Sequence, residues 1–178
     1  MQDSSFESYK VNIYNRYAFE VTKEFVKKKM QKGMMLGIFG LKGVGKTKLL
    51  QAVVNYYKKA SPETLVYITA DELQCEIEKT IKKKDIFLIS LKQKVKKAEV
   101  VCLDDISRFL VDDRLKPWYM EWFYYCKRRK KRIIYTYDCS EMMYSAMQTL
   151  GNLKPQAIMV GIPKAGQNRN LETIRVLD

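Results

Sequence analysis

The chain has 178 residues, 47% of them hydrophobic and 30% charged, which indicates a globular domain with a buried core and excludes a disordered chain. Its net charge of +13 predicts attraction to polyanions, either nucleic acid or acidic protein surfaces. Histidine is absent, which excludes histidine catalysis, and no apolar run or signal-peptide pattern marks a membrane or secreted protein, so we expect a cytoplasmic location.

The amino-terminal part predicts a helix and then a strand–loop–helix unit. Apolar residues recur at helical spacing over Tyr14–Lys29, until Gly33 interrupts them. The apolar run Met34–Phe39 indicates a buried strand, and Lys46–Tyr57 has the pattern of the helix that follows the loop. Residues 1–33 are therefore expected to form a leading segment and helix.

The loop in this unit, GLKGVGKT at Gly40–Thr47, matches the phosphate-binding pattern G-x-x-x-x-G-K-T. In such a loop, Lys46 would reach the β- and γ-phosphates of a nucleotide, and the Thr47 hydroxyl would ligate Mg²⁺. The alternative, a glycine-rich turn before a helix, would not require a strand in front of it. The predicted nucleotide-binding residues are Gly40, Leu41, Lys42, Gly43, Val44, Gly45, Lys46, Thr47 and Lys48.

Further elements follow in alternation. Thr64–Thr69 predicts a strand, and Asp71 would cap or open a helix that runs to about Lys84. Ile86–Lys97 predicts a basic helix. The later elements are a strand at Glu99–Asp105, an aromatic helix at Lys116–Lys131, a strand at Arg132–Asp138, a helix at Glu141–Leu150, a turn at Gly151–Pro155, a strand at Ala157–Ile162 and the start of a helix at Asn170–Leu177. This order predicts one α/β domain over residues 1–178, with a largely parallel five-stranded sheet between helical layers.

Acidic residues end two of the predicted strands. Asp104 and Asp105 follow an apolar strand, and downstream of a phosphate loop they suit the two acids of a P-loop ATPase. We assign Asp104 to Mg²⁺ and Asp105 to the attacking water; capping of a strand end is the alternative. Asp138, or the nearby Thr136 hydroxyl, would sense the γ-phosphate, although a helix N-cap also explains Asp138.

Aromatic and cysteine residues favour structural roles. The aromatic side chains of the helix at Lys116–Lys131 are interpreted as core, with stacking on nucleic-acid bases as the alternative; they include Trp118, Trp122, Phe123 and Tyr125. A basic cluster, Lys127–Arg132, follows them. The cysteines lack C-x-x-C spacing and are expected to be reduced, small apolar residues; they are Cys75, Cys102, Cys126 and Cys139.

Four ordered segments resemble the AAA+ core of the DnaA-type bacterial replication initiators and of the related DnaC and DnaI helicase loaders. They are FESYKVNIYNR at Phe6–Arg16, GVGKTKLLQAVVNYY at Gly43–Tyr57, CLDDISRFL at Cys102–Leu110 and IIYTYD at Ile133–Asp138. The resemblance implies a P-loop NTPase of the AAA+ type with a three-layer αβα core, and ATP and Mg²⁺ as cofactors. It places Tyr9, Val11 and Asn12 beside the adenine and Asp138 at a catalytic sensor position.

The resemblance also gives a meaning to residues 70–97, where that family carries an additional helix that contacts single-stranded DNA. The lysines of this segment would follow a phosphate backbone, with a solvated helix face as the alternative. They are Lys82, Lys83, Lys84, Lys92, Lys94, Lys96 and Lys97.

Two departures from the family pattern bear on catalysis. LGNLKPQA, at Leu150–Ala157, stands where the family carries an arginine that reaches a neighbour's nucleotide, and Lys154 cannot reproduce that planar contact. The family's helical lid is expected to be essentially absent, because the sequence ends in its first helix at 170–178. Weak or partner-dependent ATP hydrolysis is therefore expected.

Three functional hypotheses follow. The first is an ATP-binding replication protein of initiator or helicase-loader type, with an initiator, loader or replicative helicase as partner, possible single-strand contact and an AAA+ oligomer or heteromer as the expected assembly. The second is a regulator that binds such a partner and uses the nucleotide as a switch with little turnover. The third is a small P-loop kinase, against which the paired Asp104 and Asp105 argue.

Overall fold

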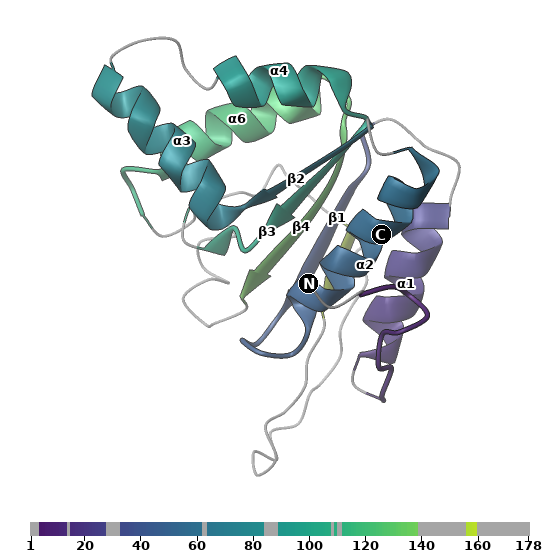
Figure 1. The fold of residues 1–178 in the computed structure, drawn as a ribbon. Coiled ribbons are helices and arrows are strands. Elements are labelled where there is room, and N and C mark those ends of the chain that lie inside the picture. The colour runs from purple at the N-terminus through teal and green to yellow at the C-terminus, as the bar shows by residue number, and fades with distance from the viewer. Residues whose placement is uncertain are drawn as a thin grey trace.

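In the computed structural model, helices cover both faces of a five-stranded parallel sheet of order β2-β3-β4-β1-β5 (Figure 1). The structure describes residues 4–13, 15–27, 33–61, 64–83, 89–107, 109, 112–138 and 156–159, without the side chains of 80–83, 89–90 and 156–159. The strands are β1 (Met35–Gly40), β2 (Leu65–Thr69), β3 (Val100–Asp104), β4 (Arg132–Asp138) and β5 (Gln156–Met159). The helices are α1 (Arg16–Lys27), α2 (Lys46–Ala60), α3 (Ala70–Lys83), α4 (Ile89–Lys97) and α6 (Lys116–Arg128). Within this described part, no helix has the length and apolar character needed to span a bilayer.

The alternation of side chains along the strands decides which helical layer each one meets. Helices α1 and α2 pack on one face, over a cluster that includes Leu36, Cys102 and Ile134. Helices α3, α4 and α6 pack on the other face, against Val101, Leu103, Ile133, Tyr135 and Tyr137. Because successive side chains alternate, Asp104 continues the series of Cys102, and Thr136 continues that of Ile134. The polar ends of β3 and β4 therefore lie on the face that α2 covers.

The predicted helices and strands that fall on described residues are present, with shifted ends. Strand β3 ends at Asp104 because Asp105 has φ 57, a left-handed conformation that leaves the strand. Strand β5 begins at Gln156, one residue before the predicted start. The helix predicted at 141–150, the turn at 151–155, the end of the last strand at 160–162 and the helix at 170–177 lie outside the described residues.

The start of α3 differs from the prediction that Asp71 opens the helix. The Thr69 backbone N–H donates to Glu72 Oε2 at 2.8 Å, and the Glu72 N–H donates to Thr69 Oγ1 at 3.2 Å. This reciprocal pair is a capping box, so Thr69 is the N-cap residue. Asp71 instead lies exposed in the first turn.

The aromatic helix α6 supports the core interpretation. Trp122 and Phe123 are buried, while Trp118 and Tyr125 are half-buried against the same cluster. Burial of a large apolar side chain stabilises the fold by about 1.5–3 kcal/mol. The helix ends at Arg128, earlier than predicted, because Lys130 adopts φ 53.

Candidate functional site

The loop between β1 and α2 takes a shape that only glycine adopts easily. Gly43 has φ 85, and Gly45, the residue before α2, has φ 104. A Cβ atom on Gly45 would lie 3.2 Å from the Tyr9 hydroxyl, whereas one on Gly43 would meet nothing within 4 Å. No side chain caps the start of α2, so the N–H groups of its first turn are available to an anion.

Lys46 is held inside this loop by three acceptors. Its Nζ donates to the carbonyl oxygens of Gly40 and Leu41, each at 2.9 Å, and to Asp138 Oδ1 at 2.5 Å. The side chain is only 9% exposed. An ammonium group has three donors, and each one is used here.

Asp104 lies at the end of β3, where three hydroxyl groups donate to its carboxylate. Thr47 and Thr136 donate to Oδ1 at 3.1 and 2.6 Å, and Tyr67 donates to Oδ2 at 3.2 Å. Burial and the nearby charge of Asp104 raise the pKa of Tyr67 well above its ordinary value, so this hydroxyl remains a proton donor. The buried carboxylate is thereby fixed in one orientation.

Asp105 follows directly and turns away from the strand. Its backbone N–H donates to Thr136 Oγ1 at 2.8 Å, and its carboxylate accepts from the Ser107 N–H at 3.3 Å. Ser107 Oγ in turn accepts from the Asp138 N–H at 2.7 Å. Thr136 and Ser107 therefore tie the ends of β3 and β4 together, which leaves the exposed Asp105 carboxylate at the edge of the cavity.

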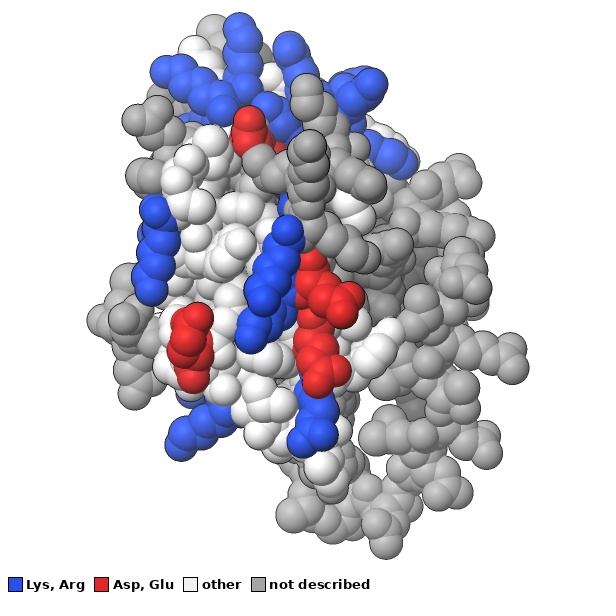
Figure 2. Space-filling model, turned by 90° about the vertical axis from the view of Figure 1, so that its right-hand side faces the viewer, with Lys and Arg blue, Asp and Glu red and all other residues white. Residues whose placement is uncertain are grey.

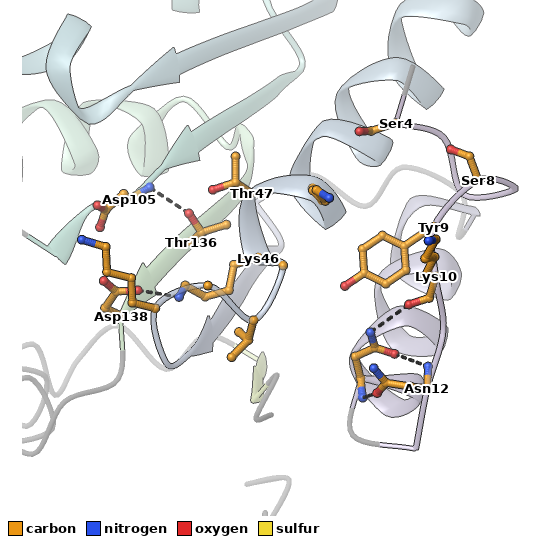
Figure 3. Close-up of a pocket in the computed structure, with 16 residues that line it drawn as sticks. Ser4, Ser8, Tyr9, Lys10, Asn12, Lys46, Thr47, Asp105, Thr136 and Asp138 are labelled. Atoms are coloured by element: carbon orange, nitrogen blue, oxygen red, sulfur yellow. Dashed lines mark hydrogen bonds and ion pairs between the residues drawn. The ribbon is translucent and has the colours of Figure 1, made fainter. Parts of the chain in front are cut away.

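Lys46 and Asp105 are among the residues that line a cavity of about 810 Å³, whereas Asp104, Tyr67 and Ser107 do not line it. Figure 3 shows Lys46, Thr47, Asp105, Thr136 and Asp138 on one side, and the leading segment with Tyr9, Lys10 and Asn12 on the other. The remaining lining residues are Ser4, Ser8, Asn15, Lys42, Gly43, Val44, Gly45 and Lys48. The cavity is thus bounded by the glycine-rich loop, the strand ends and the segment that precedes α1.

The leading segment is fixed by an asparagine pair. The Asn12 N–H donates to Asn15 Oδ1 at 2.8 Å, the Asn15 N–H donates to Asn12 Oδ1 at 3.1 Å, and Asn15 Nδ2 donates to the Lys10 carbonyl at 3.1 Å. The Tyr9 ring stacks on Phe19 at a centroid distance of 5.6 Å. An aromatic ring and amide groups therefore face the loop across the cavity (Figure 3).

The structure brings most of the predicted nucleotide-site residues together, but not all. Gly40 and Leu41 do not line the cavity and contribute their carbonyl groups to Lys46. Val11 does not line it either, and this residue is 41% exposed. The sequence did not indicate Tyr67 or Ser107. Only the pairing of β2 with β3 brings Tyr67 to Asp104, and only the pairing of β3 with β4 brings Ser107 to the Asp138 N–H.

Only some of the lysines predicted to contact DNA have side chains that the structure describes. Lys94, Lys96 and Lys97 are exposed on α4, whereas Lys92 pairs with Glu121 at 3.2 Å. Lys84 and the side chains of Lys82 and Lys83 lie outside the described residues.

The site fits a nucleoside triphosphate and a divalent cation. The open space at Gly43 and the uncapped start of α2 suit a phosphate chain, and Thr47 with Asp104 supplies the oxygen donors that Mg²⁺ prefers. In the described part of the chain, His, Cys, Asp and Glu form no cluster of three or more able to hold a metal ion. A cation here would therefore depend on the phosphates as well as on Thr47 and Asp104.

Comparison with known proteins identifies the family. The model of the bacterial DnaA ATPase domain matches residues 1–154. The chromosomal replication initiator DnaA of Onion yellows phytoplasma (strain OY-M) is 27% identical over 175 residues, which cover 96% of this chain and 34% of that protein. The chain spans only about a third of the length of such curated relatives, 34% in this case and 38% in another.

Solved structures share the fold. A replication initiator DnaA bound to AMPPCP and single-stranded DNA superposes with a TM-score of 0.69 at 25% identity, covering 91% of this chain and 50% of that one. The DnaC helicase loader superposes with a TM-score of 0.65 at 19% identity, covering 90% and 97%. The loader structure supports the fold alone, whereas the family match extends along most of the sequence. The chain therefore belongs to the bacterial DnaA ATPase-domain family.

Proposed function

We propose that this protein is an ATP-binding AAA+ module of DNA replication, of initiator or helicase-loader type, with slow hydrolysis when it acts alone. The observation that carries the proposal is the meeting of Lys46, Thr47, Asp105 and Asp138 in one cavity, with Asp104 held beside them by the Thr47 hydroxyl. Membership of the DnaA ATPase-domain family supports it.

Each polar group has a role in this proposal. Lys46 and the N–H groups of the glycine-rich loop bind the phosphates, and Tyr9 and Asn12 bound the space for the base. Thr47 and Asp104 hold Mg²⁺, which offsets the negative charge of the phosphates. Asp105 orients the attacking water, and Asp138 responds to the terminal phosphate.

Partners and single-stranded DNA belong to the same proposal. A DnaA relative has been solved with AMPPCP and single-stranded DNA, and the DnaC loader shares this fold. The exposed lysines of α4 and the lysines at 82–84 would contact the strand in a salt-dependent manner. The protein partner would be an initiator, a loader or a replicative helicase.

The decisive experiment separates binding from turnover. ATP binding and phosphate release are measured for the wild type, Lys46→Ala and Asp105→Asn, each alone, with single-stranded DNA and with a replicative helicase. We expect Lys46→Ala to lose binding, and Asp105→Asn to bind ATP but to lose hydrolysis. Unchanged ATP binding in Lys46→Ala would refute the site assignment.

A nucleotide-switched regulator with little turnover is the second candidate. The ion pair of Lys46 with Asp138 favours this candidate. A phosphate that binds Lys46 must replace one of its three acceptors, so the site would have one arrangement with nucleotide and another without it. No stimulated hydrolysis, together with ATP-dependent partner binding, would favour this candidate. Phosphate transfer to a small-molecule acceptor would instead identify a kinase and overturn both replication candidates.

A further inference from the structure

A second basic surface lies at the edge of the sheet where the strands begin, away from the nucleotide cavity. It is formed by the last turn of α2 and by the turn that follows α6, and both lie at the upper right of Figure 1. Figure 2 shows Lys and Arg side chains gathered at the upper end of the α1 and α2 face. We name as the basic edge the exposed residues Lys58, Lys59, Lys127, Arg128, Arg129 and Lys130.

The two parts of the basic edge are joined through the sheet. After the end of α2, the Thr64 N–H donates to the Ser61 carbonyl at 3.2 Å, and the Glu99 N–H donates to the Thr64 carbonyl at 2.7 Å. Arg132 follows the α6 turn directly, and its N–H donates to the Glu99 carbonyl at 3.0 Å. Lys131 Nζ donates to the Ala98 carbonyl at 2.5 Å and fastens the same turn to the end of α4. The cations therefore belong to one connected rim of the fold.

Negative charge is scarce on this rim. Along the described ends of α2, α4 and α6 and the residues that join them to the strands, Glu99 is the one acidic residue. Glu7, whose pKa a backbone hydrogen bond and the charge of Lys59 help to lower, is a further carboxylate near the end of α2. None of the ion pairs in the described part includes a residue of the basic edge. The opposite edge instead carries both signs of charge, because Asp104, Asp105 and Asp138 lie there with the cavity lysines Lys10, Lys42, Lys46 and Lys48. The basic edge therefore carries an excess of positive charge among its described residues.

Lys130 indicates that the stabilisation of helix ends by cations does not account for every cation of the basic edge. The helix dipole favours cations in a last turn, which accounts for Lys58 and Lys59. Lys130, however, follows the α6 cap with φ 53, while its N–H donates to the Lys127 carbonyl at 2.8 Å and the Lys131 N–H to the Cys126 carbonyl at 3.1 Å. This is a Schellman motif, whose left-handed position favours glycine. A lysine in this position raises the conformational energy of the backbone.

We propose that the basic edge binds the phosphodiester backbone of nucleic acid. Its cations are exposed and lie side by side on one rim, which suits repeated phosphates, whereas a protein partner would call for an apolar centre. The surface shares no residue with the nucleotide cavity or with the lysines at 82–97. It would give the domain a contact with nucleic acid on the side opposite its nucleotide.

The test uses the full chain and fluorescein-labelled oligonucleotides, single-stranded and duplex, titrated by fluorescence anisotropy between about 50 and 200 mM salt. The edge variants are Lys58→Ala/Lys59→Ala and Arg128→Ala/Lys130→Gly. The control, Arg16→Ala/Lys116→Ala, removes the same charge where α1 and α6 begin. We expect each edge variant to bind about tenfold more weakly and to lose about one to two units of salt slope, while the control changes less than about twofold. The two oligonucleotides distinguish a single strand from a duplex as the source of the phosphates.

The variant Lys130→Gly separates binding from folding. Glycine removes the left-handed strain, so the thermal midpoint should rise by about 2–4 °C while binding weakens. Edge variants that bind like the wild type at all salt concentrations would overturn the proposal. An equal loss in the control variant would also overturn it, because the effect would then follow net charge alone.

Discussion

Lys46 Nζ and Asp138 Oδ1 lie 2.5 Å apart, although 92 residues separate them in the sequence. The pair joins the glycine-rich loop to the end of β4, in the cavity that Asp105 also lines. Strands β1 and β4 are neighbours with Gly40 in register with Asp138, so the sheet itself sets this contact. A phosphate group that binds Lys46 must therefore take the place of one of its three acceptors.

Replacement of Lys46 by alanine should abolish tight nucleotide binding. Loss of charged hydrogen bonds to phosphate should cost about 3 kcal/mol, which is about a 100-fold rise in the dissociation constant. Titration with a fluorescent ATP analogue measures the effect. Lys79→Ala removes the same charge from the exposed side of α3 and should bind normally; a similar loss in this control would contradict a specific role for Lys46.

Replacement of Tyr67 by phenylalanine should weaken the response to Mg²⁺. The Tyr67 hydroxyl donates to Asp104 Oδ2, and groups that orient a metal-binding carboxylate typically contribute about 10–100-fold to metal affinity. We expect the Mg²⁺ concentration that gives half-maximal nucleotide binding to rise by about tenfold. Tyr124→Phe, on the exposed side of α6, is the matched control. An unchanged Mg²⁺ midpoint in Tyr67→Phe would show that the hydrogen bond does not orient the carboxylate.

Gly37 in the middle of β1 has no room for a side chain. A Cβ atom there would lie 3.1 Å from the Cζ and Oη atoms of the buried Tyr135 ring. We expect Gly37→Ala to lower the free energy of unfolding by about 1–3 kcal/mol, measured by chemical denaturation. Tyr135→Leu removes the crowded atoms, so the double variant should be more stable than the sum of the single changes predicts. Strict additivity would contradict the steric explanation.

The cysteines should differ in reactivity. Cys75 is exposed, whereas Cys102 and Cys126 are buried free thiols. Burial raises the pKa of Cys126 to about 12 and also raises that of Cys102, so neither forms the reactive thiolate in the folded protein. In a Cys139→Ser background, a thiol reagent should label Cys75 promptly and the other two only on unfolding. Prompt labelling of all three in native buffer would contradict the buried positions.

The sequence by itself determined the elements and the chemical groups. Apolar periodicity predicts the strands and helices because burial requires it, and GLKGVGKT predicts the phosphate loop because its glycines permit positive φ. The paired Asp104 and Asp105 were found from their place after an apolar strand. These signals are local, so a single sequence is enough to detect them.

The tertiary structure alone decided which groups meet. The order β2-β3-β4-β1-β5 and the parallel register bring Tyr67 and Thr136 to Asp104 and bring Asp138 to Lys46. The same packing gathers the basic edge from two helix ends that lie about 70 residues apart in the chain. Such contacts depend on how strands pair and helices cross, and residue spacing along one chain does not encode that geometry.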